Sequence, residues 1–210
     1  MAIHPTAVVD PSAKIDPTAE IGPFAVIGPE TVIGARTKVG AHCVVEHATL
    51  GADNVLHPGC FVGTPPQDLK YIGEASYLVV GDRTVCREYM TANVATEPGF
   101  TTRIGSDCLL MAYSHVAHNC QVGDHVVIAN SVQMAGYVVV DDWAIVGGGT
   151  VVHQFTRIGR HSMIGGGSRI PQDVAPFVKT AGSPPRNAGI NSIGLYAQST
   201  EPRRRRRVRV

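Results

Sequence analysis

A repeat of six residues constrains the fold of this sequence more than any other feature. From Ile104 to Ile170 every sixth residue is apolar, without a slip. A small or β-branched residue follows each of them by four positions, and glycine often comes directly after the apolar position. Each hexapeptide therefore predicts a short strand and a turn. A period of six, with no helical spacing, indicates parallel strands wound into a solenoid that buries one apolar residue per strand.

The same repeat is present in the N-terminal part of the chain. It runs from Ile3 to Val45, loses one residue, and resumes at Leu50. If three hexapeptides form one triangular coil, residues about 18 apart stack in a column along the solenoid. The pattern is missing from 65–78 and 91–102, so we expect both segments to leave the solenoid as excursion loops. Excursions from a rigid repeat are places where a site can be built.

The repeat and its end divide the chain into three predicted segments. We expect a hexapeptide-repeat β-helix over 1–178, a short C-terminal cap or extension over 179–202, and a disordered basic tail over 203–210. The tail "RRRRRVRV" is arginine-rich, while the chain as a whole has a net charge of only +1. We expect no nucleic-acid partner for the body of the protein. For the tail, a weak contact with anionic lipid or nucleic acid is the alternative to simple solvation.

The five cysteines favour a reducing compartment. The sequence has no charged-then-apolar leader and no apolar run of membrane-spanning length, so we expect a cytoplasmic protein without a transmembrane segment. Most of the cysteines fall at the small, inward position of the repeat, which predicts buried hydrophobic side chains rather than redox or metal-binding groups. These cysteines are Cys43, Cys60, Cys108 and Cys120.

One column of the predicted solenoid gathers polar side chains. His118 is followed one and two coils later by Gly136 and Gln154, and His153 is adjacent to Gln154. A histidine can take a proton from a hydroxyl group near neutral pH. An unobstructed backbone N–H, such as that of Gly136, can stabilise the oxyanion that forms when the hydroxyl attacks an acyl carbonyl. This column predicts direct acyl transfer with His118 as general base.

Other interpretations of these histidines remain open. His118 and His153 can equally be surface residues of an inert prism. His115 falls on the preceding hexapeptide, so we expect it near a different edge or around a corner, as a supporting group. A metal site needs a third convergent ligand. No third residue follows at a suitable spacing, so we expect no metal ion. A γ-class carbonic anhydrase-like metal protein is the alternative interpretation in which a metal is bound.

Several motifs resemble one family of enzymes. They are "PQDLKY" (66–71), "VGDRT" (80–84), "SHVAHNC" (114–120), "IAN" (128–130), "MAGYVVVDD" (134–142), "VVHQF" (151–155) and "QDVAPFV" (172–178). Together with the hexapeptides, they resemble the bacterial UDP-N-acetylglucosamine O-acyltransferases that begin lipid A synthesis. The resemblance implies a left-handed parallel β-helix and a homotrimer with active sites between subunits. It also implies transfer of a hydroxyacyl chain from acyl carrier protein to the sugar 3-hydroxyl, with no cofactor beyond the carrier thioester.

The resemblance also implies roles for individual residues. His118 corresponds to the general base and Gly136 to the oxyanion donor. The residues expected to bind substrate are Asp68, Lys70, His115, Tyr137, His153, Gln154 and Asn191, of which Asp68 is expected near the sugar, Lys70 near its phosphate or the acyl group, and Asn191 at the nucleotide. Met163 and Gly166 correspond to positions near the end of the acyl chain.

The sequence departs from the family pattern in three places. Asn119 stands where the family commonly has aspartate after the catalytic histidine, and Tyr137 stands where it often has histidine. The usual C-terminal helical domain is expected to be absent after 202. The alternatives are an N- or O-acyltransferase acting on another nucleotide sugar, and a catalytically impaired β-solenoid scaffold.

Overall fold

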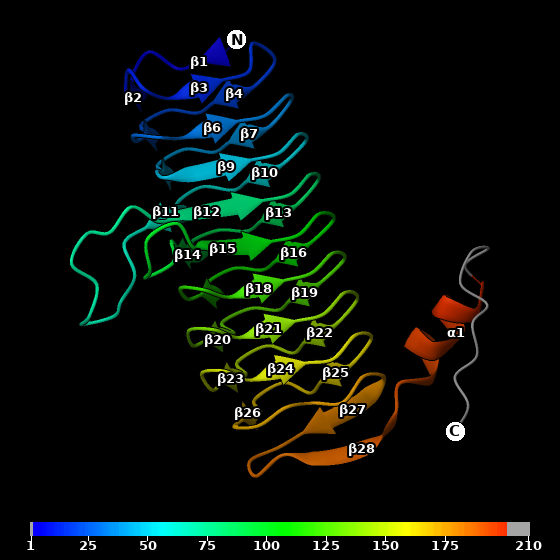
Figure 1. Cartoon of the computed structure of the whole chain (residues 1–210). Coiled ribbons are helices and arrows are strands. Elements are labelled where there is room, and N and C mark those ends of the chain that lie inside the picture. Colours follow the sequence, from blue (N-terminus) through cyan, green and yellow to red (C-terminus); the bar gives the residue numbers. More distant parts are fainter. Residues whose placement is uncertain (1, 201–210) are drawn as a thin grey trace.

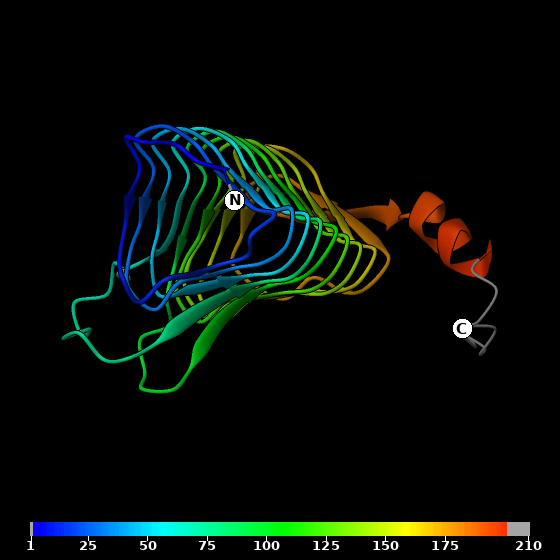
Figure 2. The ribbon, with the colours of Figure 1, turned by 90° about the horizontal axis from the view of Figure 1, so that it is seen from above.

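The computed structural model describes residues 2–200, and these form a stack of three-sided coils. Short parallel strands lie above one another on each side, and the view along the stack shows a triangular section (Figures 1 and 2). The predicted left-handed parallel β-helix is confirmed. The predicted basic tail, 203–210, lies outside the described residues, and the proposed division of the chain at 178 and 202 stays a prediction.

Three sheets form the sides of the prism. The eleven-stranded sheet contains β1 (Ala2–Ile3), β4 (Glu20–Ile21), β7 (Lys38–Val39), β10 (Val55–Leu56), β13 (Val85–Cys86), β16 (Leu109–Leu110), β19 (Val127–Ile128), β22 (Ile145–Val146), β25 (Met163–Ile164), β27 (Val178–Ala181) and β28 (Arg186–Ile190). The nine-stranded sheet contains β2 (Val8–Val9), β5 (Val26–Ile27), β8 (Val44–Val45), β11 (Phe61–Thr64), β14 (Thr91–Asn93), β17 (His115–Val116), β20 (Gln133–Met134), β23 (Val151–Val152) and β26 (Arg169–Ile170). The eight-stranded sheet contains β3 (Lys14–Ile15), β6 (Val32–Ile33), β9 (Ala48–Leu50), β12 (Tyr77–Val80), β15 (Thr101–Ile104), β18 (Gln121–Val122), β21 (Val139–Val140) and β24 (Arg157–Ile158).

The pairing register follows the spacing of the sequence. Val127 pairs with Ile145 in the regular part of the chain. Val32 pairs with Thr49, because one residue has been lost between their coils. The apolar residue of each hexapeptide points inward and is buried from Ile21 to Ile170. The core is thus a single apolar column inside the prism. Its packing fixes the position of each coil, and of the turns at its corners, along the axis of the stack.

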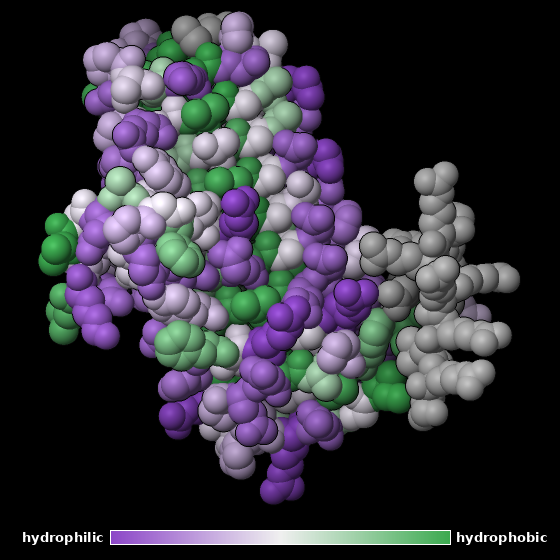
Figure 3. All heavy atoms as spheres, in the orientation of Figure 1, coloured by the Kyte–Doolittle hydropathy of each residue, from purple (hydrophilic) through white to green (hydrophobic). Residues whose placement is uncertain are grey.

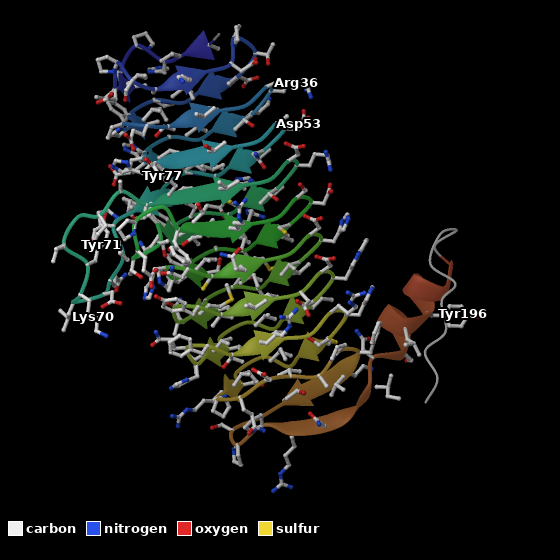
Figure 4. All side chains as sticks on the ribbon, viewed as in Figure 1. Arg36, Asp53, Lys70, Tyr71, Tyr77 and Tyr196 are labelled. Atoms are coloured by element: carbon white, nitrogen blue, oxygen red, sulfur yellow. The ribbon has the colours of Figure 1, made fainter. Side chains whose placement is uncertain are left out.

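The corners are tight turns in which a non-glycine residue takes a left-handed backbone conformation. At one corner the φ angles of Asn119, Tyr137 and Phe155 are 61°, 60° and 66°. At another corner the guanidinium of Arg36 donates to the carboxylate of Asp53 on the next coil, with Nε 2.7 Å from Oδ1 (Figure 4). This conformation costs an L-residue free energy. Contacts between corner residues on successive coils help to offset that cost.

Both excursions are present, but they are shorter than the sequence predicts. The segments outside the strands are 65–76 and 94–100. The predicted ranges 65–78 and 91–102 wrongly include paired residues, because Tyr77 pairs with Thr101 and Thr91 pairs with Phe61. Alternation of buried and exposed residues over only a few positions is too short to distinguish from loop sequence. The excursions leave the prism on the same side (Figure 2).

The last described segment departs from the coil. The strands β27 and β28 form an antiparallel hairpin that extends the eleven-stranded sheet. Helix α1 (Ser192–Thr200) follows and projects away from the prism (Figure 2). Asn191 precedes the helix, its Oδ1 accepts the N–H of Gly194 at 3.4 Å, and its Nδ2 donates to the carbonyl of His161 at 2.8 Å. The asparagine therefore caps the helix and ties its start to the prism.

Candidate active site

His118 lies at the corner where the nine-stranded sheet passes into the eight-stranded sheet. It follows β17, and the two excursions leave the solenoid at the same corner, one after β11 and the other after β14. β11, β14 and β17 are consecutive neighbours in one sheet, so the excursions and the histidine that follow them lie on successive coils. Figure 1 shows both excursions leaving the stack beside β11 and β14. The topology therefore brings three segments that are distant in the sequence to one edge of the prism.

The imidazole of His118 is oriented by the side chain that follows it. Nδ1 of His118 lies 2.9 Å from Oδ1 of Asn119. The same oxygen accepts the backbone N–H of Thr96 at 3.1 Å, so it is the acceptor end of the amide and Nδ1 must be the donor. The neutral ring then carries its proton on Nδ1. Nε2 keeps a free lone pair, which is what a general base needs.

Gly136 lies beside this ring on the next coil. The N–H of Tyr137 donates to the carbonyl of His118 at 3.0 Å, which fixes the two turns against each other. A Cβ atom at residue 136 would collide with Cε1 and Nε2 of His118, so the position requires glycine. Within residues 2–200, the backbone N–H of Gly136 has no protein acceptor. It is available to an oxyanion beside the base.

Two cavities meet at this corner. One has a volume of about 440 Å³ and is lined by His115, His118, Gly136 and Gln154 among others. The other has a volume of about 320 Å³, and its lining includes Asp68, Lys70, Tyr137 and again Gln154. The side chain of Gln154 is therefore shared by both. The larger cavity gives access to His118, and the smaller one adjoins it at Gln154.

The first excursion places charged groups over the histidine. Oδ2 of Asp68 lies 3.8 Å from Nε2 of His118, and Oδ1 of Asp68 accepts the backbone N–H of Lys70 at 2.9 Å. Lys70 points away from the prism at the outer end of the excursion (Figure 4). Leu69 and Ile72 on the same excursion are exposed, and hydrophobic spheres stand among hydrophilic ones there (Figure 3).

His115 is closer to His118 than the sequence indicates. The expectation that it lies near a different edge is wrong, because His115 lines the same cavity as His118. It stands on the outer face of β17, directly before the corner, and its Nδ1 lies 2.7 Å from Oγ1 of Thr91 on β14. Burial lowers the pKa of His115, and the neighbouring His118 lowers it further. His115 is therefore a neutral hydrogen-bonding group beside the base.

The other candidate residues are spread more widely. His153 is exposed, its Nδ1 lies 3.0 Å from the carbonyl of Gln154, and its ring lines neither cavity. Met163 and Gly166 lie on or directly after β25 in the eleven-stranded sheet. Asn191 is buried against His161 at the start of α1. A single chain does not bring Met163, Gly166 or Asn191 to the cavities beside His118.

Glu97 is a site residue that the sequence does not reveal. It lies in the second excursion, lines the smaller cavity, and accepts hydrogen bonds from Nδ2 of Asn119 at 2.6 Å and from the hydroxyl of Tyr137. The hydrogen bond from Tyr137 is the main cause that lowers the pKa of Glu97, so this carboxylate is ionised near neutral pH. The only signal in the sequence is that Glu97 is the sole charged residue of that excursion.

No group of three His, Cys, Asp or Glu residues among residues 2–200 could hold a metal ion. No helix in that part is long and apolar enough to cross a membrane.

The sequence and structure were compared with known proteins. Residues 12–47 and 101–136 match the family model described as bacterial transferase hexapeptide (six repeats). An acyl-[acyl-carrier-protein]–UDP-N-acetylglucosamine O-acyltransferase from Synechocystis sp. is 52% identical over 195 residues, which are 92% of this chain and 71% of that protein. A protein of the same name from Anaeromyxobacter sp. is 49% identical over 211 residues, which cover 100% of this chain and 82% of that protein.

A solved structure gives the same comparison in three dimensions. The UDP-N-acetylglucosamine O-acyltransferase from Moraxella catarrhalis superposes with a TM-score of 0.91 at 41% identity, covering 96% of this chain and 79% of that one. The similarity therefore extends over nearly the whole of the described chain, including the corner that carries His118.

Proposed function

Since this chain belongs to the acyl-[acyl-carrier-protein]–UDP-N-acetylglucosamine O-acyltransferase family, we propose that it transfers a hydroxyacyl chain from acyl carrier protein to the 3-hydroxyl of UDP-N-acetylglucosamine, with His118 as general base. This is the first step of lipid A biosynthesis. The observation that carries the assignment of the base is the hydrogen bond from Nδ1 of His118 to Asn119, which leaves Nε2 free beside a cavity that Gly136 also lines.

The chemistry follows from the positions of these atoms. Nε2 of His118 takes the proton of the sugar hydroxyl as its oxygen attacks the carbonyl carbon of the thioester. The carbonyl oxygen becomes negative, and the N–H of Gly136 donates a hydrogen bond to it. When the tetrahedral intermediate collapses, the C–S bond breaks and the protonated His118 returns its proton to the departing thiolate. No covalent intermediate with the enzyme is needed, and we propose no metal or cofactor.

We propose substrate contacts for the residues around the base. Asp68 approaches Nε2 of His118 from the first excursion and is a candidate for contact with the sugar. Lys70 lines the smaller cavity and is a candidate for contact with the phosphate or the acyl group. His115 and Gln154 line the larger cavity, and Tyr137 lines the smaller one together with Gln154. His153 is a more peripheral candidate, because it lines neither cavity.

We further propose that the active enzyme is a homotrimer. Met163, Gly166 and Asn191, which are the candidates for the acyl-chain end and the nucleotide, lie on other faces of the prism than His118. A neighbouring copy of the chain can supply them to one site, whereas a single chain cannot. Acyl carrier protein and a UDP-sugar are the proposed partners, and a cytoplasmic location fits both substrates.

The decisive test compares the wild-type protein with His118→Ala. We expect the wild type to move a hydroxyacyl group from acyl carrier protein to UDP-N-acetylglucosamine in metal-free buffer. Loss of the general base should lower the rate by roughly 10²-fold or more. His125→Ala is the matched control, because His125 stacks on Trp143 at another corner, with ring centroids 3.9 Å apart. An inactive wild type would instead point to a different acceptor, such as an amino sugar, or to a scaffold.

A further inference from the structure

The residue that orients the base is neutral in this protein. Asn119 is 7% exposed and occupies the position directly after His118. An amide can hold the imidazole in one tautomer, but it carries no charge with which to stabilise the imidazolium that forms during transfer. A catalytic histidine is usually backed by a carboxylate for that purpose. The corner therefore needs a negative charge from elsewhere in the fold.

The amide of Asn119 bridges His118 to a carboxylate. Its Oδ1 accepts from Nδ1 of His118 at 2.9 Å, and its Nδ2 donates to Oε2 of Glu97 at 2.6 Å. Thr96 fixes the orientation of the amide through its N–H, 3.1 Å from Oδ1. A flipped amide would place an oxygen against the Glu97 carboxylate and an NH₂ group against two donors. These hydrogen bonds are therefore compatible with only one orientation of the Asn119 amide.

Glu97 is in turn held by a second unusual residue. The hydroxyl of Tyr137 donates to Oε1 of Glu97, and the hydroxyl of Thr96 lies 3.0 Å from Oε2. Burial raises the pKa of Tyr137, and its hydrogen bond to Glu97 raises it further, so the phenol remains a donor. The two departures at Asn119 and Tyr137 thus meet at one carboxylate.

We propose that Glu97 is a positioning residue that supplies the missing negative charge to His118 through the Asn119 amide. When His118 takes a proton on Nε2, the positive ring is stabilised by the Asn119 dipole and by the Glu97 carboxylate one amide further away. No proton moves to Glu97, because an amide is a poor proton relay. The inference rests on the proposed function, since it assumes that His118 acts as the base.

Other charged and titratable groups face the same ring. Asp68 approaches Nε2 from the first excursion at 3.8 Å. His115 on β17 is electrostatically coupled to His118, and the Tyr137 ring meets the imidazole edge-on, with centroids 5.4 Å apart. Asp68 and His115 lie on the substrate side of the ring. Glu97 is the carboxylate that acts from the Nδ1 side.

The test is a cycle of conservative variants. Glu97→Gln keeps the shape and removes the charge, so we expect kcat to fall roughly tenfold with little change in the KM for UDP-N-acetylglucosamine. The imidazolium loses stabilisation, so the acidic limb of the pH–rate profile should move to lower pH while the plateau rate falls. Glu88→Gln is the matched control, because Glu88 pairs with Arg87 at another corner of the prism.

The double variant Glu97→Gln/Asn119→Asp separates a charge effect from a structural one. It places a carboxylate directly against Nδ1 of His118, so we expect most of the lost kcat to return. Asn119→Asp alone should not be beneficial, because it sets two carboxylates against each other. A Glu97→Gln variant with wild-type kcat and pH profile would overturn the proposal, and so would a double variant that is no better than the single one.

A measurement that does not require catalysis tests the proposal even when the substrate is unknown. The His118 ring should titrate at lower pH in Glu97→Gln than in the wild type when it is followed by NMR, with His118→Ala used to assign the signal. If the wild type proves inactive, the proposed function fails while the titration still tests the coupling to Glu97. Unchanged titration would refute the coupling whatever the activity.

Discussion

Gly136 and His118 constrain each other across two coils. The ring of His118 occupies the volume that a side chain at residue 136 would fill, and both residues line the same cavity. A substitution at residue 136 should therefore displace the proposed base and obstruct the proposed oxyanion donor together. The backbone of Gly136 does not have a positive φ, so glycine is required here by the close approach of the ring rather than by conformation.

We expect Gly136→Ala to lower kcat by roughly 10²-fold, because one oxyanion donor typically contributes that much. Gly148→Ala is the control. Gly148 occupies the equivalent turn position at another corner, and its added Cβ would meet no atom closer than 3.1 Å. Thermal unfolding of both variants measures any general damage. Comparable activities for the two alanine variants would contradict the role assigned to Gly136.

Individual strands of this fold are too short to be stable alone. Most contain two residues, and each buries one apolar side chain between the coils before and after it. The stability of a coil therefore depends on having neighbours on both sides, as in other repeat proteins. Ile128 on β19 is fully buried in the middle of its sheet, whereas Ile3 on β1 is only partly buried at the end.

We expect Ile128→Ala to lower the free energy of unfolding by about 2–5 kcal/mol, because the rigid coils around it leave a cavity that cannot collapse. Ile3→Ala should cost clearly less, since the first coil has a neighbour on one side only. Urea unfolding followed by circular dichroism measures both. Equal losses at the two positions would show that the coils unfold as one unit without a weaker end.

The excursions show how an element gains a function by its position in the stack. Nδ2 of Asn93 donates to the carbonyls of Thr64 and Pro65, at 3.3 Å and 3.0 Å, so the bases of the two excursions are joined. Asp68 then approaches Nε2 of His118 directly, whereas Glu97 is connected to Nδ1 through the Asn119 amide. The coils of the prism fix where each excursion begins and ends, and the excursions carry the charged side chains.

At the scale of the whole molecule, the proposed site extends beyond one chain. The candidate residues for the acyl-chain end and the nucleotide lie away from His118. The segment that carries Asn191 also exposes apolar side chains, including Ile190 and Ile193 at 65% and 78% exposure. A neighbouring copy of the chain in a trimer would both cover these side chains and complete the site.

We expect light scattering to give three times the chain mass in solution. Ile193→Asp should shift that mass toward smaller species and reduce activity in parallel, because it places a charge on an apolar surface that a second copy would cover. Val8→Asp is the control, since Val8 is a similarly exposed apolar residue on the first coil. A monomeric and fully active wild type would contradict the trimer.

The prism and the column that contains His118 follow from the repeat in the amino-acid sequence alone. The apolar period fixes the inward residue of every strand, and the spacing of 18 places His118, Gly136 and Gln154 above one another. These predictions succeed because a regular repeat converts distance along the chain into height in the stack. The bounds of the excursions and the location of His115 were less accurate, since each depends on a turn only a few residues long.

The groups that surround His118 depend on contacts in three dimensions. Asp68 and Glu97 lie 50 and 21 residues before His118 in loops that obey no period, so no spacing rule predicts their contacts. The path of each loop is set by packing and hydrogen bonding against its neighbours, such as those of Thr96 and Tyr137 with Glu97. The period of six determines the positions of residues inside the repeat. Residues in the inserted loops take their positions from three-dimensional contacts alone.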